Sequence, residues 1–206
     1  MPKSTFLNLP VEKRQHIFSC ALQEFARHPY EQASLTEIVN IADIAKGSMY
    51  QYFEDKKDLY KYVVQTVYQH KRSFLQSVWD MTDRVEFFSL VSLYYRQSWR
   101  YAKQFPEYHK VTANFWDSRD EALRAEILRE KQIRSMEFVD LLQHGSRIGV
   151  IDTDVDQAAA WFVYHAVGKA LIDNFLEQDV NASAHETFID SVLSILEQGL
   201  RSRKGY

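Results

Sequence analysis

The sequence predicts an all-α protein, because its patterning, its composition and its helix-start residues all favour long helices. Apolar residues recur three and four positions apart along nearly the whole chain, whereas strict alternation is scarce. The 206 residues include only six glycines and four prolines, too few for a β-sandwich or a Gly-turn solenoid. We therefore predict about nine helices and no strand.

Capping residues and prolines place the helix starts in chain order. A proline suits the first turn of a helix, and the side-chain oxygen of Ser or Asp accepts from the free N–H groups there. The starts fall at Pro10, Ser34 (a capping box with Glu37), Lys46, Asp55, Pro106, 118–121, 154–157 and 183–186. Gly145 and Gly149 bracket a predicted stop.

The lengths of these helices and the distribution of aromatic residues divide the chain in two. The first three helices are short and end near Phe53, whereas the later helices are longer and contain most of the aromatic residues. No Pro/Gly/Ser-rich linker separates the two parts. We predict domains at 1–55 and 56–206, with the fourth helix as a rigid bridge.

Residues 34–53 contain the most specific signal in the chain. A capped helix is followed by a tight break at 42–44 and by a second short helix from Lys46 to Tyr52. Two short helices joined by a tight turn form a helix-turn-helix, whose second helix can enter the major groove of DNA. No acidic residue lies between Ile44 and Phe53, so the local field is positive although the net charge is −3.

The segment Lys46-Gly47-Ser48-Met49-Tyr50-Gln51-Tyr52-Phe53, followed by Lys56 and Leu59, resembles the signature of the tetracycline-repressor (TetR) family. Ile17, Ala21 and Phe25, and Thr36-Glu37-Ile38, extend the resemblance over about residues 11–60. It implies an all-helical homodimeric repressor with an N-terminal DNA-binding domain and a C-terminal domain that binds a ligand and dimerises.

By position, the resemblance implies a set of DNA contacts around the second short helix. They are Thr36, Lys46, Gly47, Ser48, Tyr50, Gln51, Tyr52 and Lys56. Lys56 is expected to hold a phosphate together with the N-terminus of its helix. Two positions depart from the family pattern. Asp43 stands where glycine is usual and tolerates a left-handed conformation, whereas Ala45 replaces the usual serine and removes one hydroxyl.

Large aromatic rings are concentrated between Phe74 and Phe175, where a helical core normally contains Leu, Ile and Val. Such rings leave irregular gaps and suit the lining of a small-molecule pocket, although many of them are ordinary core. The candidate lining residues are Phe88, Tyr95, Trp99, Phe115, Trp116, Phe138, Trp161 and His165. Because carboxylates are sparse among the rings, we expect an uncharged or anionic amphipathic ligand, such as a fatty-acyl compound.

Two C-terminal segments, 156–177 and 184–200, are predicted to form a homodimer. The first is rich in alanine and contains Gly168, and the second is apolar around more than one side. A helix that is apolar over so wide an arc needs two neighbours. The alternative is a terminal helix packed within its own chain. A symmetric pair of recognition helices would bind a palindromic operator.

The single cysteine and the absence of a visible signal peptide favour the cytoplasm, and the family resemblance implies a bacterial regulator that lies on the nucleoid when bound to DNA. The single cysteine, Cys20, excludes an internal disulfide and any cysteine-cluster metal site, and no signal peptide or membrane span is visible. We predict no cofactor, no metal, no membrane partner and no enzymatic activity. The alternatives are a helical enzyme, for which the seven histidines form no recognised motif, or a partner-binding scaffold.

Overall fold

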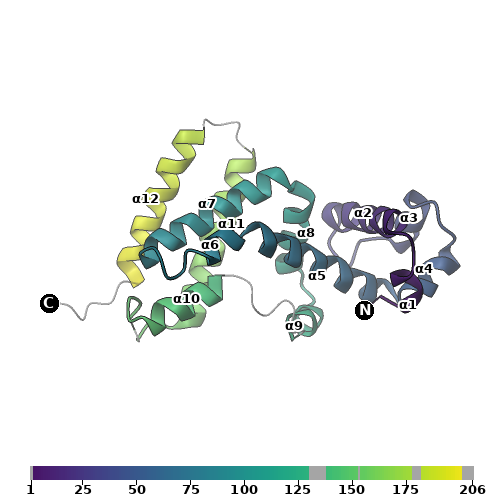
Figure 1. Ribbon diagram of the computed structural model, residues 1–206, viewed down its shortest axis with the longest axis horizontal. Helices are drawn as coiled ribbons and strands as arrows, with labels where there is room; N and C mark the ends of the chain where they lie inside the picture. The colour runs from purple at the N-terminus through teal and green to yellow at the C-terminus, as the bar shows by residue number, and fades with distance from the viewer. Residues whose placement is uncertain (1, 130–137, 153, 178–181, 201–206) are drawn as a thin grey trace. The chain divides into compact units, whose positions relative to one another are not determined.

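The computed structural model describes residues 2–129, 138–152, 154–177 and 182–200, and its regular secondary structure in these ranges is helical (Figure 1). The helices are α1 (Ser4–Leu7), α2 (Val11–Arg27), α3 (Leu35–Ile41), α4 (Lys46–Tyr52), α5 (Lys56–Phe74), α6 (Gln76–Trp79), α7 (Phe87–Gln104), α8 (Pro106–Asp117), α9 (Glu121–Arg129), α10 (Phe138–Arg147), α11 (Gln157–Glu177) and α12 (Ala182–Leu200). The all-α prediction is confirmed. The twelve helices in the described ranges exceed the predicted nine partly because α1 and α6 have four residues each, too few to show a period.

Several predicted helix starts are confirmed by the hydrogen bonds of their caps. Ser34 Oγ accepts from the backbone N–H of Glu37 at 3.3 Å, at the start of α3. Asp55 Oδ1 accepts from the N–H of Asp58 at 2.8 Å, at the start of α5. Pro106 is the first residue of α8, as predicted. These local signals determine where α3, α5 and α8 begin.

The residue that caps α9 lies two positions after the predicted cap, Ser118. Asp120 Oδ1 accepts from the N–H of Leu123 at 2.8 Å and caps the helix. Ser118, the predicted cap, instead donates from its hydroxyl to Glu31 Oε1 at 2.9 Å and accepts from the N–H of Asp120. A tertiary hydrogen bond therefore takes the serine away from the helix end.

The helices form two compact units that each contain two separate stretches of chain. Unit 1 comprises residues 1–71 and 105–134, and unit 2 comprises residues 72–104 and 135–206. This division differs from the expected boundary between residues 55 and 56, because α8 and α9 belong with the N-terminal helices. The sequence pattern could not show this, since it contains no signal for which helices pack together.

Unit 1 is held together by contacts of α8 and α9 with the first helices. Asn114 on α8 donates from its side-chain amide to Phe25 O at 2.9 Å and to Ala26 O at 3.3 Å, near the C-terminal end of α2. Glu126 on α9 accepts from Lys57 at 3.2 Å and from Lys61, both on α5. These two hydrogen-bonded ammonium groups lower the pKa of Glu126. Unit 1 thus anchors α2 and α5.

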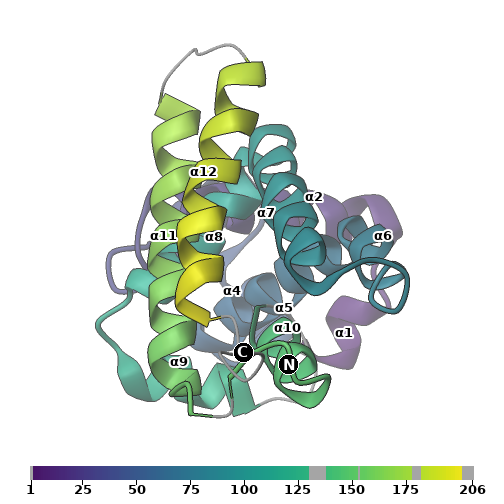
Figure 2. The same ribbon diagram turned by 90° about the vertical axis from the view of Figure 1, so that its left-hand side faces the viewer.

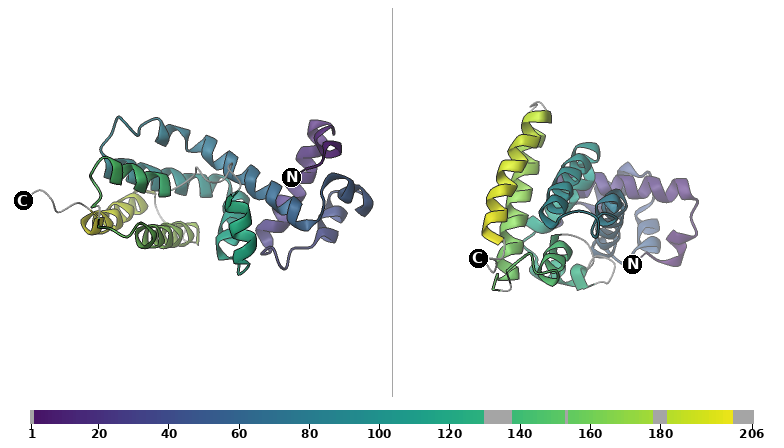
Figure 3. Two further views of the ribbon diagram at one scale, coloured as in Figure 1. Left: turned by 90° about the horizontal axis from the view of Figure 1, so that it is seen from below. Right: turned by 60° about the vertical axis from the view of Figure 1, so that its left-hand side comes forward.

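Unit 2 is built around α7, α11 and α12, and its last two helices lie side by side (Figures 2 and 3). The buried Tyr95 hydroxyl on α7 donates to Tyr164 O on α11 at 2.7 Å. A Cβ placed on Gly168 would lie 2.6 Å from the Tyr95 ring. Gly168 was expected to bring two subunits together, but it permits close approach of α11 to α7 within one chain.

We predict that Gly168→Ala destabilises the protein. The added methyl group must displace the buried, hydrogen-bonded Tyr95 ring, so the free energy of unfolding should fall by about 1–3 kcal/mol. Gly199→Ala is the matched control, because nothing lies within 4 Å of its Cβ position and alanine favours a helix. Chemical denaturation measures both. Equal stabilities of the two variants would contradict the predicted close contact.

Candidate nucleic-acid interface

The entry to α3 is set by a buried glutamate on α2. Glu24 Oε1 accepts from the backbone N–H of Ser34 at 2.7 Å, and Glu24 itself is almost completely buried. In the predicted capping box, this N–H was the partner of Glu37. Only half of the box forms, because a residue ten positions upstream occupies the other half. The tertiary contact therefore connects α2 to the first residue of the helix-turn-helix.

The turn between α3 and α4 has the left-handed residue that the sequence suggested. Asp43 has φ = 49°, a conformation that aspartate adopts more readily than most residues other than glycine. The N–H of the next residue, Ile44, bonds to Val39 O at 3.1 Å. The turn is therefore tight, and α3 and α4 form a helix-turn-helix.

One side of α4 is open to solvent and polar. Lys46, Gly47 and Gln51 are exposed, Ser48 is half-buried, and Tyr50 is 46% exposed. No atom lies within 4 Å of the position that a Gly47 Cβ would take. Packing within the protein therefore does not require glycine at residue 47. Thr36 is also exposed, in the first turn of α3.

The opposite side of α4 belongs to the core of unit 1. Met49 and Phe53 are buried. Tyr52 was expected on the recognition surface, but it is only 8% exposed and its ring centroid lies 6.0 Å from that of Phe6. The motif match did not distinguish the two tyrosines, whereas the helical spacing of residues 49, 52 and 53 favours an inward position for Tyr52.

Lys56 is also placed differently from the expected phosphate contact. Its Nζ donates to Tyr30 O at 2.7 Å, to Ala33 O at 3.0 Å and to Glu31 O at 3.5 Å. The ammonium also lies 4.6 Å from the centroid of the Tyr30 ring. Lys56 thus binds the loop between α2 and α3 and positions the helix-turn-helix from within the protein.

The N-terminal residues that contact α4 were not predicted from the sequence pattern (Figure 1). Phe6 on α1 is fully buried, and its ring centroid lies 4.8 Å from that of Phe53 and 5.4 Å from that of Tyr62. A helix of four residues with one buried side chain is too short to show a period. The available signal was a single aromatic residue ahead of Pro10.

The expected pocket-lining residues do not all come together. Phe88, Tyr95 and Trp99 are buried in the core of unit 2, and the partly buried Trp161 packs against that core. His165 stacks on Trp161 with centroids 4.9 Å apart. The remaining candidates are Phe115 and Trp116, which lie on α8 in unit 1, and Phe138, whose side chain lies outside the described part of the chain.

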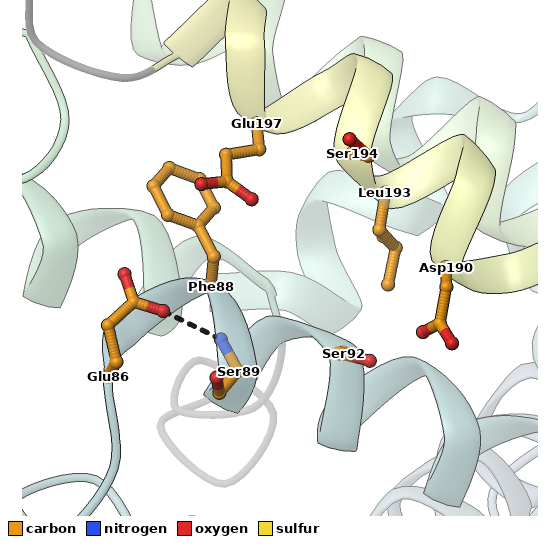
Figure 4. A pocket seen from close by; sticks show the side chains of 8 residues that line it. All are labelled: Glu86, Phe88, Ser89, Ser92, Asp190, Leu193, Ser194 and Glu197. Carbon is orange, nitrogen blue, oxygen red and sulfur yellow. Dashed lines mark hydrogen bonds between the residues drawn. The ribbon is translucent and has the colours of Figure 1, made fainter.

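A surface pocket of about 250 Å³ lies between the start of α7 and α12 (Figure 4). Its lining residues are Glu86, Phe88, Ser89, Ser92, Asp190, Leu193, Ser194 and Glu197. Phe88 is the only expected lining residue among the eight. Arg96 pairs with Asp190 at 2.5 Å and with Glu186 at 3.4 Å. Three carboxylates and no basic residue line the pocket, so its lining does not favour an anionic head group.

The described ranges contain neither a metal-binding cluster nor a membrane-spanning helix. No group of three or more His, Cys, Asp or Glu residues there is arranged to hold a metal ion. None of the helices there has the length and apolar content needed to cross a membrane.

Comparison with known proteins supports the predicted resemblance. Residues 17–63 match the family of bacterial regulatory proteins, tetR family. Over 49 residues the chain is 41% identical to the HTH-type transcriptional regulator AcrR of Shigella flexneri. This segment is 24% of the chain and 23% of AcrR, so the match spans about a quarter of that relative.

Similarity in fold extends over nearly the whole chain. A TetR family transcriptional regulator from Chloroflexus aurantiacus is 27% identical, with a TM-score of 0.73, and the match covers 98% of this chain and 100% of that one. FadR from Bacillus subtilis, solved in complex with stearoyl-CoA, is 18% identical, with a TM-score of 0.66 and coverage of 91% and 99%. The predicted resemblance to the TetR family is confirmed.

We predict that Lys56→Met destabilises the protein. The variant leaves the carbonyls of the α2–α3 loop without their charged donor, so the free energy of unfolding should fall by about 1.5–3 kcal/mol. Lys13→Met, at an exposed position on α2, should change it by less than about 0.5 kcal/mol. Thermal or chemical denaturation tests both. A loss at Lys56 no larger than that at Lys13 would refute the assigned role.

Proposed function

We propose that this chain, a TetR family transcriptional regulator, binds a palindromic operator as a homodimer and releases it when a hydrophobic or amphipathic small molecule binds. The observation that carries the proposal is the exposed polar side of α4, with an uncrowded glycine at its first turn. In this role the protein acts in the bacterial cytoplasm and lies on the nucleoid when bound.

The exposed residues of α4 have the chemistry that a DNA major groove requires. Lys46 supplies a cation for phosphate, and Gln51 can donate to and accept from a base edge. Ser48 and Tyr50 offer hydroxyl groups for phosphate or base contacts. The open space at Gly47 lets the sugar-phosphate backbone come close to the helix. We assign DNA contacts to these five residues and to Thr36, and we omit Tyr52 and Lys56.

Two helices of unit 2 support a dimer interface. Phe162 on α11 is 68% exposed and Ile195 on α12 is 70% exposed within the single chain. Further large apolar residues are exposed on the same pair of helices: Val163, Leu176 and Phe188. Large apolar residues exposed on neighbouring helices are typical of protein interaction surfaces. A two-fold axis through this surface would pair two copies of α4, which matches the symmetry of a palindromic operator.

The aromatic core of unit 2 supports binding of an apolar effector. Buried Tyr and Trp rings combine an apolar surface with a polar tip, as in many small-molecule sites. Such an effector would act by binding more tightly to a state of the protein that does not bind DNA. FadR of Bacillus subtilis, which shares the fold, was solved with stearoyl-CoA. Long-chain acyl compounds are therefore the first probes for this chain, with the aromatic core of unit 2 and not the carboxylate-lined surface pocket as the candidate site.

We predict that Gly47→Ala weakens DNA binding without reducing stability. The added methyl group meets open space in the protein and favours the helix, but it stands where DNA would approach. The affinity for the duplex upstream of the protein's own gene should fall about tenfold or more. Lys46→Ala should lower this affinity by a similar factor. Mobility shift measures this binding, and the complex should contain two chains per duplex.

The control for this experiment is Lys13→Ala, at an exposed position of α2 outside the helix-turn-helix. It should bind the duplex like the wild type. If the two α4 variants also bind like the wild type, α4 is not the DNA-contacting helix. If the wild-type protein binds no sequence in that region, the proposal that it binds an operator there is contradicted.

We predict that stearoyl-CoA or stearate both stabilises the protein and releases the operator. A ligand at about 100 times its Kd adds about 2.7 kcal/mol of stability, which corresponds to a Tm rise of about 5–10 °C. Differential scanning fluorimetry and a mobility shift at the same ligand concentration test the two effects. A Tm rise without operator release would show binding that is not coupled to DNA, and it would contradict the proposed regulation.

A further inference from the structure

The backbone carbonyls in the last turn of α4 need hydrogen-bond donors from outside the helix. The helix has seven residues, includes a glycine, and is preceded by the N-cap residue Ala45, which provides no side-chain cap. A helix this short is not stable by itself, and its last four carbonyls have no partner within the helix. In this structure the Met49 carbonyl accepts from the N–H of Phe53 at 2.9 Å. The three carbonyls that follow need donors from elsewhere.

All three donors come from the first residues of the chain. Lys3 donates from its backbone N–H to Tyr52 O at 2.8 Å and from its Nζ to Tyr50 O at 3.0 Å. Thr5 donates from Oγ1 to Gln51 O. The Lys3 ammonium also carries positive charge to the end of a helix dipole that favours it. Residues Lys3, Thr5 and Phe6 form a unit that we call the N-terminal clamp.

The clamp is itself fixed at both ends. The buried Phe6 ring packs against Tyr52 and Phe53 at the end of α4 and against Tyr62 on α5. At the other side, Arg14 on α2 donates to Leu7 O at 3.0 Å, at the end of α1. The segment is thus held between α2, α4 and α5, and its donors are presented to the last turn of α4.

We propose that the N-terminal clamp holds the recognition helix in its DNA-binding conformation, with Lys3 and Thr5 as positioning residues that need not contact DNA. This inference rests on the proposed function, because it concerns the helix assigned to the operator. Without the clamp, the last turn of α4 would fray, and Tyr50 and Gln51 would lose their defined orientation before binding. The operator would then have to order the helix, which lowers affinity.

The test compares Lys3→Met, Thr5→Val and the double variant with the wild-type full-length protein. Phe6 is kept, so that α1 remains anchored. Because each substitution removes one hydrogen bond to an α4 carbonyl, affinity for the operator duplex should fall about threefold for each single variant and about tenfold for the double variant. Thr5→Ser, which keeps the hydroxyl, should restore wild-type affinity. Lys13→Met, which removes an exposed lysine of α2, is the charge control and should bind normally.

Two measurements separate positioning from direct contact. Amide hydrogen exchange in peptides covering residues 46–53 should become faster in the double variant, while exchange in α7 and α11 stays unchanged. The slope of log affinity against log salt should equal that of the wild type. A slope reduced by about one, with unchanged exchange in α4, would show that Lys3 contacts a phosphate and would overturn the proposal.

Unchanged affinity of the double variant for the operator duplex would also overturn the proposed role of the clamp. If the wild-type protein binds no duplex, the proposed function fails first, and the clamp is then judged by exchange alone. In that case unchanged exchange of residues 46–53 refutes the clamp, and faster exchange supports it as a device that orders α4. If the double variant unfolds, the single variant Thr5→Val tests the clamp by the same measurements of operator affinity and amide exchange.

Discussion

The structure around α4 depends on one constraint: a seven-residue helix cannot satisfy or stabilise its own backbone, so other elements must do so. The N-terminal clamp bonds to its last carbonyls. Glu24 and Lys56 fix the loop and the helix start that precede it. Asp43 closes the turn in a left-handed conformation. Each contact uses a side chain or backbone group away from the polar side of α4, which leaves that side available for a ligand.

The composition of unit 1 follows from the same need for outside support. α2 carries Glu24 and Arg14, so its position determines both the start of α3 and the end of α1. α8 in turn bonds to the end of α2 through Asn114, and α9 pairs with α5 through Glu126. The unit that contains the helix-turn-helix is therefore larger than the segment that matches the family, and it includes two helices from the middle of the chain.

The aromatic residues show where composition stops being informative. Their number suggested one lined pocket, yet Phe115 packs near Tyr68 in unit 1, with ring centroids 6.1 Å apart, while Tyr95 is buried in unit 2. A ring can line a pocket, fill a core or connect two helices with the same hydrophobic gain. The described surface pocket is lined by carboxylates and serines, a composition that the ring count did not suggest.

Sequence patterns were sufficient to predict the all-α class, the capped starts of α3 and α5, the left-handed turn at Asp43 and the helix-turn-helix, because these depend on interactions within about one helical turn. Packing between distant segments makes Tyr52 a core residue, directs Lys56 to backbone carbonyls and places Gly168 against the Tyr95 ring. It also joins residue 3 to residue 52. These pairings link positions far apart in the chain, and a local pattern contains no information about which distant group will meet a given donor or acceptor.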